Sequence, residues 1–173
     1  MIHTIRKAVR EDLPQIFAIY KEARKFMAEN GNAGQWGSDK PPAPVLEQNV
    51  EDGDLYVLDE DGELRCVFFF AAGPDPTYAF IEDGAWLAHG PYGVIHRIAS
   101  AGKRKGAASE CIRWAMTQCE DLRLDTHRNN IPMQSLLSKL GFTRCGIIYL
   151  EDGDPRIAYQ ILTGRKERND ASV

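Results

Sequence analysis

The chain has 173 residues, 43% of them hydrophobic and 27% charged, a composition typical of a globular protein large enough to bury a core. Its formal net charge of −4 argues against non-specific nucleic-acid binding, which usually requires a basic face. We expect one domain over residues 1–163, followed by a polar tail over residues 164–173.

The first third of the chain predicts a strand followed by two helices. Apolar residues recur at helical spacing in the longer helix, with Asp12 as the expected N-cap and Gln15 in the capping-box position. A Gly-, Asn-, Ser- and Pro-rich loop is expected between the two helices. The expected ranges are 3–8 for the strand, 13–29 for the long helix, 31–43 for the loop and 44–50 for the short helix.

The remainder predicts strands alternating with helices, with hairpins in the middle and at the end. Residues 78–93 predict irregular structure or a short strand, and Asn130 and Gly141 are expected to begin and end the last helix. The expected strands are 55–58, 64–72, 94–100, 122–126, 144–150 and 156–162. Two helices are expected. The first follows the strand at 94–100, and its apolar stripe consists of Ala108, Cys111, Ile112, Ala115 and Cys119. The second ends at Leu140.

This order of elements predicts an α/β protein with a mixed sheet and helices on both faces. The cysteines are Cys66, Cys111, Cys119 and Cys145, and no two of them form a C-x-x-C pair. We therefore expect free thiols in a reducing cytoplasm, and no metal. No run resembles a signal peptide or a membrane helix, so a cytoplasmic protein without a membrane partner is expected.

A basic, glycine-containing turn stands between the strand at 94–100 and the helix that follows. Its residues are Lys103, Arg104, Lys105, Gly106, Ala107 and Ala108. Backbone amides at a helix N-terminus favour an anion, so the turn predicts a site for the phosphates of a cofactor. The turn alone equally fits an ordinary strand–helix connection with solvated basic residues.

Together with a second block, this turn resembles the GNAT superfamily of acetyl-CoA-dependent N-acetyltransferases. The turn matches the family's Q/R-x-x-G-x-G/A motif except that Lys103 replaces the Gln or Arg. The second block runs from Asn130 to Phe142 and resembles the family's Asn-led helix that ends in K-L-G-F. The resemblance implies a six- to seven-stranded, mostly antiparallel sheet with a splayed central strand pair.

The resemblance also implies a set of residues that contact coenzyme A. Acetyl-CoA is the expected co-substrate, with its pantetheine arm along the strand at 94–100 and its pyrophosphate on the amides of the basic turn. The implied cofactor-binding residues are Ile98, Ala99, Ser100, Lys103, Arg104, Lys105, Gly106, Ala107, Ala108, Asn130 and Met133.

The acid and base of the reaction are not fixed by the motifs. Many family members carry a Tyr two residues before the Lys of K-L-G-F, and this chain has Leu137 there. His96 as a base and Tyr149 as an acid are the candidates, and for each the alternative that we favour from the sequence alone is a structural role. Asp125 and His127 could serve catalysis, although capping a turn is the interpretation we prefer for Asp125.

The acceptor implied by the resemblance is a primary amine of a small molecule or a protein. Candidates for its pocket are Trp36, Trp86 and Tyr92, all of which also fit simple packing. A non-catalytic module that binds acyl-CoA or a partner on the same scaffold is the alternative. Whether the protein forms a homodimer stays an open question, because nothing in the sequence decides the oligomeric state.

Overall fold

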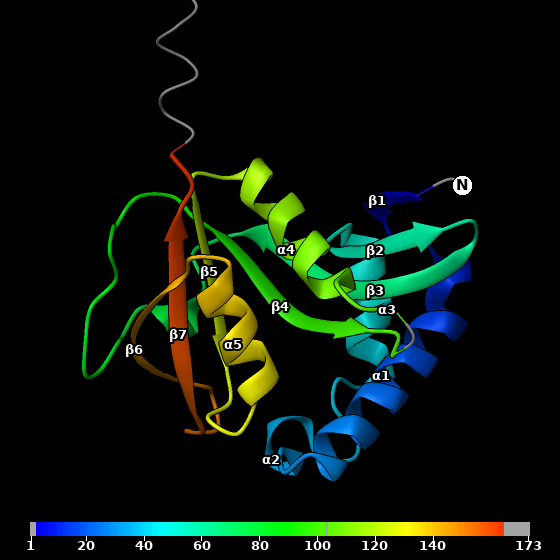
Figure 1. The fold of residues 1–173 in the computed structure, drawn as a ribbon, viewed down its shortest axis with the longest axis horizontal. Helices are drawn as coiled ribbons and strands as arrows, with labels where there is room; N and C mark the ends of the chain where they lie inside the picture. Colours follow the sequence, from blue (N-terminus) through cyan, green and yellow to red (C-terminus); the bar gives the residue numbers. More distant parts are fainter. Residues whose placement is uncertain (1–2, 103, 165–173) are drawn as a thin grey trace, which may run out of the picture. The chain divides into compact units, whose positions relative to one another are not determined.

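The computed structural model describes residues 3–102 and 104–164. Their contacts divide into two compact units. Figure 1 draws the helices and strands of these residues. Unit 1 comprises the described residues of Met1–Phe70 and His96–Ile112, and unit 2 those of Ala71–Ile95 and Arg113–Val173. A single domain over residues 1–163 stays a prediction, and most of the predicted tail lies outside the described residues.

Among the described residues, seven strands are hydrogen-bonded in the order β1-β2-β3-β4-β5-β7-β6. Most neighbours are antiparallel, and β4 and β5 pair in parallel. This confirms the predicted mixed α/β fold with a mostly antiparallel sheet of six to seven strands. The strands are β1 (His3–Lys7), β2 (Leu55–Glu60), β3 (Glu63–Ala72), β4 (Gly93–Ser100), β5 (Asp121–Thr126), β6 (Thr143–Tyr149) and β7 (Pro155–Leu162).

Unit 1 is built around the amphipathic helix α1. Ile16 and Tyr20, one turn apart on that helix, are buried in a core that also contains Leu46, Leu55 and Val67. Burying an apolar side chain of this size stabilises the fold by about 1.5–3 kcal/mol, so this core holds the helix in place. The helical elements of unit 1 are η1 (Arg10–Asp12), α1 (Leu13–Glu29), α2 (Ala33–Trp36) and α3 (Ala43–Asp52).

Asp12 does not cap α1, and this prediction was wrong. Its carboxylate accepts two hydrogen bonds from the guanidinium of Arg6, at 2.7 and 2.9 Å. Gln15 does not complete a capping box either: its side chain accepts from the N–H of Leu64 and donates to the carbonyl of Gly62. A bidentate bond between two opposite charges fixes both oxygens of the carboxylate, so the tertiary partner displaces the local cap.

Unit 2 contains β5, β6 and β7, the first residues of β4, and helix α5 (Ile131–Lys139). A 3-10 turn, η2 (Pro76–Tyr78), opens a stretch that is otherwise irregular up to β4, in agreement with the prediction. Glu82 forms an isolated bridge with Ile147 of β6. Helix α4 (Ala107–Gln118) begins in unit 1 and ends in unit 2.

Two glycines let the irregular stretch approach β6 backbone to backbone. A Cβ on Gly84 would lie 1.9 Å from the carbonyl oxygen of Cys145, and a Cβ on Gly146 would lie 2.5 Å from that of Glu82. No side chain fits at such distances, so glycine is required at both positions.

None of the helices in the described ranges has both the length and the apolarity needed to cross a bilayer.

Candidate active site

The turn before α4 has the geometry expected of an anion cradle. The first helical bond runs from the N–H of Glu110 to the carbonyl of Gly106, at 3.0 Å. The amides of Ala107, Ala108 and Ser109 therefore lie at the helix end without an intrahelical acceptor, where the helix dipole favours negative charge. Gly106 has a φ of +85°, and no described residue other than its two chain neighbours has a heavy atom within 4 Å of the position of a Cβ there. The space above the turn is open to a ligand.

The charge of Arg104 in this turn is largely compensated. Its guanidinium lies 3.1 Å from the carboxylate of Glu60 and donates to Glu110 at 3.0 Å. Burial opposes ionisation of Glu110, but hydrogen bonds from His3 and Arg104 outweigh it and hold the pKa of Glu110 below its usual range. Lys105 is exposed and forms no ion pair with a described residue, and Lys103 lies outside the described residues. Lys105 is thus the cation that the described part of the turn offers to a phosphate.

β4 carries an unusual backbone conformation next to its predicted contact residues. Arg97 has a φ of +53°, which is uncommon for a residue with a side chain. The carbonyl of Arg97 accepts a hydrogen bond of 2.6 Å from the hydroxyl of Tyr20, and its guanidinium bonds Asn49. Burial lowers the pKa of Arg97. Sequence reasoning missed this group, because a positive φ outside glycine leaves no pattern in the sequence.

The predicted contact residues of β4 follow Arg97 directly. Ala99 is buried in the core of unit 1, while Ile98 and Ser100 are half-buried. Just beyond the strand, the N–H of Ala101 donates to the carbonyl of Arg65 in β3, at 2.9 Å. This end of β4 is therefore anchored to β3.

The two candidate catalytic residues have different surroundings. His96 is half-buried in β4, with its ring centroid 5.7 Å from that of Phe69. Tyr149, at the end of β6, is exposed and donates a hydrogen bond to the carboxylate of Glu82. That bond, with the nearby negative charge, raises the pKa of Tyr149. The phenol therefore holds its proton more firmly than a free tyrosine.

Helix α5 begins as predicted. The side chain of Asn130 accepts a hydrogen bond of 3.2 Å from the N–H of Met133 and so caps the helix. Leu137, where many relatives carry the acid, is fully buried. Its side chain packs in the interior and supplies no proton donor.

The aromatic residues predicted for the acceptor pocket are all packed against other side chains. Trp36 contacts Tyr20 edge to face, with the centroids 5.6 Å apart. Trp86 and Tyr92 enclose the guanidinium of Arg123, whose Cζ lies 4.3 and 3.8 Å from the two ring centroids. Trp86 is only 8% exposed, and its burial argues against direct contact with a substrate. The acceptor roles stay predictions.

Two groups near the end of β5 form local bonds. Asp125 accepts a hydrogen bond of 2.6 Å from the hydroxyl of the buried Tyr78, and its role in capping the turn stays a prediction. Burial and the negative charge of Asp125 raise the pKa of Tyr78 well above its ordinary value. His127 caps the turn, since its Nδ1 accepts from the N–H of Asn129 at 3.0 Å.

Over the described ranges, no three His, Cys, Asp or Glu side chains gather in a way that could hold a metal ion.

Comparisons with known proteins then identify the family. No protein-family model and no curated protein matches the chain. A solved structure of a GNAT-family acetyltransferase from Streptococcus agalactiae is 30% identical in sequence, with a TM-score of 0.83. The match covers 92% of this chain and 95% of that one. The chain belongs to the GNAT family of acetyltransferases.

More distant solved structures share the fold. An acetyltransferase from Listeria monocytogenes is 21% identical, with a TM-score of 0.67, and the match covers 92% of this chain and 94% of that one. A chain of the NatC complex, solved with Gag peptide and CoA, is 12% identical, with a TM-score of 0.62 over 94% of this chain and 99% of that one. At these identities the likeness concerns the fold alone.

Proposed function

We propose that this GNAT protein transfers the acetyl group of acetyl-CoA to a primary amine of a small molecule or a protein. The observation that carries the proposal is the open turn before α4, where Gly106 leaves space beside the amides of Ala107, Ala108 and Ser109. Aligned amides with a helix dipole bind phosphate oxygens, and acetyl-CoA carries such oxygens in its pyrophosphate. The CoA bound in the related NatC structure is consistent with this co-substrate.

In this proposal the phosphates contact the amides of Lys103 to Ala108, with Lys103 and Lys105 adding positive charge. The pantetheine arm contacts the backbone of Ile98, Ala99 and Ser100 and the residues that open α5. Asn130 and Met133 are those residues, as the family resemblance implies. Because both substrates are held at once, direct attack in a ternary complex avoids much of the entropic cost of a two-substrate reaction.

The chemistry requires a neutral amine, a donor to the developing oxyanion and a proton for the leaving thiolate. His96 is the proposed base and Tyr149 the proposed acid. The bond from Tyr149 to Glu82 works against proton donation, so Tyr149 becomes a better acid when substrate breaks that bond. Trp36, Trp86 and Tyr92 are the proposed residues of the acceptor pocket.

Calorimetric titration of free CoA and acetyl-CoA against Gly106→Glu tests the proposal. The new carboxylate brings like charge and bulk to the cradle, and we expect affinity to fall about a hundredfold or more. Gly106→Ala is the matched control, since it shares the backbone strain of a positive φ without the charge. Unchanged affinity in the Glu variant would show that the cradle is not the phosphate site.

Release of the CoA thiol in the presence of different amines then measures turnover. Thiol release that depends on an added amine supports acetyl transfer. CoA binding without turnover on any amine would instead favour the non-catalytic alternative.

A further inference from the structure

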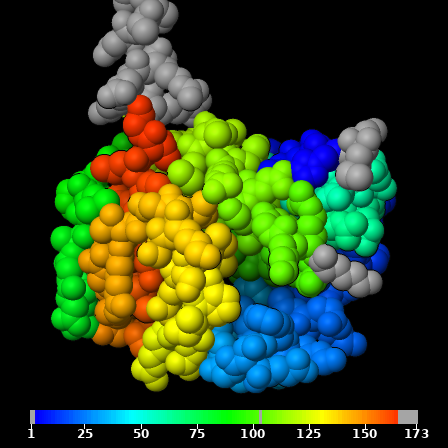
Figure 2. All heavy atoms as spheres, viewed as in Figure 1, coloured from blue at the N-terminus to red at the C-terminus, as the bar shows by residue number. Residues whose placement is uncertain are grey.

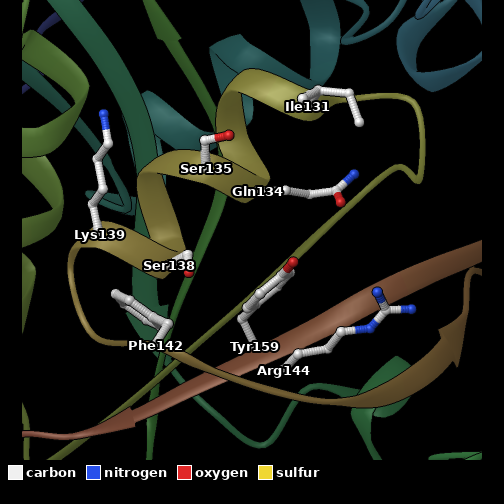
Figure 3. A pocket seen from close by; sticks show the side chains of 8 residues that line it. All are labelled: Ile131, Gln134, Ser135, Ser138, Lys139, Phe142, Arg144 and Tyr159. Atoms are coloured by element: carbon white, nitrogen blue, oxygen red, sulfur yellow. The ribbon is translucent and has the colours of Figure 1, made fainter.

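Unit 2 contains a cavity that the proposed acetyl transfer does not use. It lies between α5, β6 and β7 and has a volume of about 580 Å³, a size typical of small-molecule sites. Figure 3 shows the side chains that surround it. In the space-filling view, α5 (yellow) and β6 (orange) lie next to each other on this face (Figure 2).

The charged residues that line the cavity are all positive. Lys139 at the end of α5 and Arg144 in β6 are exposed cations, and the lining includes no acidic residue. Neither cation forms an ion pair with a described residue. Ser135 and Ser138 add hydroxyl groups, and Phe142 provides an apolar wall. The cavity thus offers a positive, hydrogen-bonding surface beside an aromatic ring.

Tyr159 is the residue that points to a ligand. It is only 5% exposed, yet its hydroxyl is directed into the cavity (Figure 3) and has no hydrogen-bond partner among the described residues. Arg144 is its direct cross-strand neighbour in the β6–β7 ladder. Burial raises the pKa of Tyr159 and the charge of Arg144 opposes this shift, and the phenol stays a proton donor. The hydroxyl therefore has a hydrogen bond to offer to a ligand that enters the cavity.

Helix geometry separates this cavity from the proposed CoA contacts. At 3.6 residues per turn, Ile131, Ser135 and Ser138 lie on one face of α5, and Met133 and Leu137 lie on the opposite face. The residues that the family resemblance assigns to CoA therefore turn away from the cavity. A ligand in this cavity would therefore contact a different face of α5 from the one that carries Met133.

We propose that this cavity binds a small molecule that carries a carboxylate or phosphate group. The oxyanion accepts a hydrogen bond from the hydroxyl of Tyr159 and pairs with the guanidinium of Arg144, whose planar fork matches two oxygens of such a group. Lys139 adds charge at the rim, and an apolar part of the ligand packs on Phe142. The site is a second ligand site of the protein, beyond acetyl transfer.

Amide chemical-shift titration of the full chain tests this site with three probes. Benzoate carries a carboxylate, phenyl phosphate carries a phosphate, and benzamide has the same ring without charge. We expect at least one of the two anions to shift the amides of Ser135, Ser138 and Arg144 in a saturable way, with much weaker effects from benzamide. Whichever anion binds more tightly identifies the headgroup.

Two variants examine the assigned contacts. Tyr159→Phe removes only an unpartnered hydroxyl, so it retains the packing, and we expect the dissociation constant of the better anion to rise about tenfold or more. We expect a similar loss in Arg144→Gln. Arg113→Gln is the control, because it removes the same charge from an exposed position on α4. We expect Arg113→Gln to bind like the wild type.

Four results would overturn the inference. They are no shifts at the cavity amides with either anion, equal binding of benzamide, equal affinity in Tyr159→Phe, and loss of the shifts when CoA is present. The titrations without CoA do not depend on acetyl transfer. A failure of the cavity is therefore distinguishable from a failure of the proposed function.

Discussion

Arg123 illustrates how single contacts hold unit 2 together. Its guanidinium lies between the rings of Trp86 and Tyr92 and donates to the carbonyl of Ala88 at 2.7 Å. Lysine has neither the planar group that stacks on rings nor the same fork of donors. We expect Arg123→Lys to lower the free energy of unfolding by about 2 kcal/mol, measured by urea denaturation. The exposed Arg113→Lys should change it by less than about 0.5 kcal/mol, and an equal effect in both would contradict the role of the rings.

The single residue Asp12 makes the stability of the folded protein depend on pH. Its hydrogen bonds to Arg6, opposed by burial, hold the pKa of Asp12 below its usual range in the folded state. The stability it contributes is therefore present above its unfolded pKa of about 3.9 and is lost as the pH falls through its folded pKa. We expect Asp12→Asn to flatten the loss of stability below about pH 4, measured by urea unfolding across the acid range. An unchanged acid profile would show that the pair with Arg6 adds nothing.

At the scale of elements, the irregular stretch before β4 depends on its contact with β6. Alanine at Gly84 would place a Cβ 1.9 Å from the carbonyl oxygen of Cys145, so one of the two backbones must move. We expect Gly84→Ala to lower the free energy of unfolding by about 2–4 kcal/mol and to lower the melting temperature.

Gly90 supplies the matched control in the same stretch. Apart from its chain neighbours, no described residue has an atom within 4 Å of a Cβ at Gly90, and the φ of Gly90 is not in the left-handed region. Gly90→Ala should therefore change the stability by less than about 0.5 kcal/mol. If both alanine variants melt at the same temperature, the stretch does not depend on close approach to β6.

The same scale shows what the sequence could predict. The bounds expected for α1 agree with the structure, because apolar spacing along one helix is a local property. The cap at Asp12 failed because its partner Arg6 lies in β1, outside the helix pattern. The turn at Gly106 was predictable as a local motif, since a strand, a glycine and a helix follow one another in the chain.

The parts of the site that the sequence did not predict depend on long-range register. The positive φ of Arg97 is supported by Tyr20 and Asn49, which are 77 and 48 residues away along the chain. The cavity at Tyr159 exists only once β6 pairs with β7 and α5 lies beside them. No local spacing in the sequence encodes contacts between such distant residues, so periodicity alone could not predict them.

At the scale of the whole molecule, ligand binding should stabilise the native chain. A ligand at about 100 times its dissociation constant stabilises the native state by about 2.7 kcal/mol. For a chain of this length, acetyl-CoA should then raise the melting temperature by about 5–10 °C, measured by thermal unfolding. Gly106→Glu should show no such rise. An equal rise in both proteins would place acetyl-CoA away from the cradle.

The four cysteines are free, and three of them are buried. A hydrogen bond with Cys66 and burial raise the pKa of Cys111, and burial raises the pKa of Cys145. The half-buried Cys119 donates to the carbonyl of Ala115. Since disulfide reagents react with accessible thiolates, we expect the buried Cys111 and Cys145 to react slowly with them in the folded protein. A colour reaction that counts released CoA therefore reads product above a low enzyme blank.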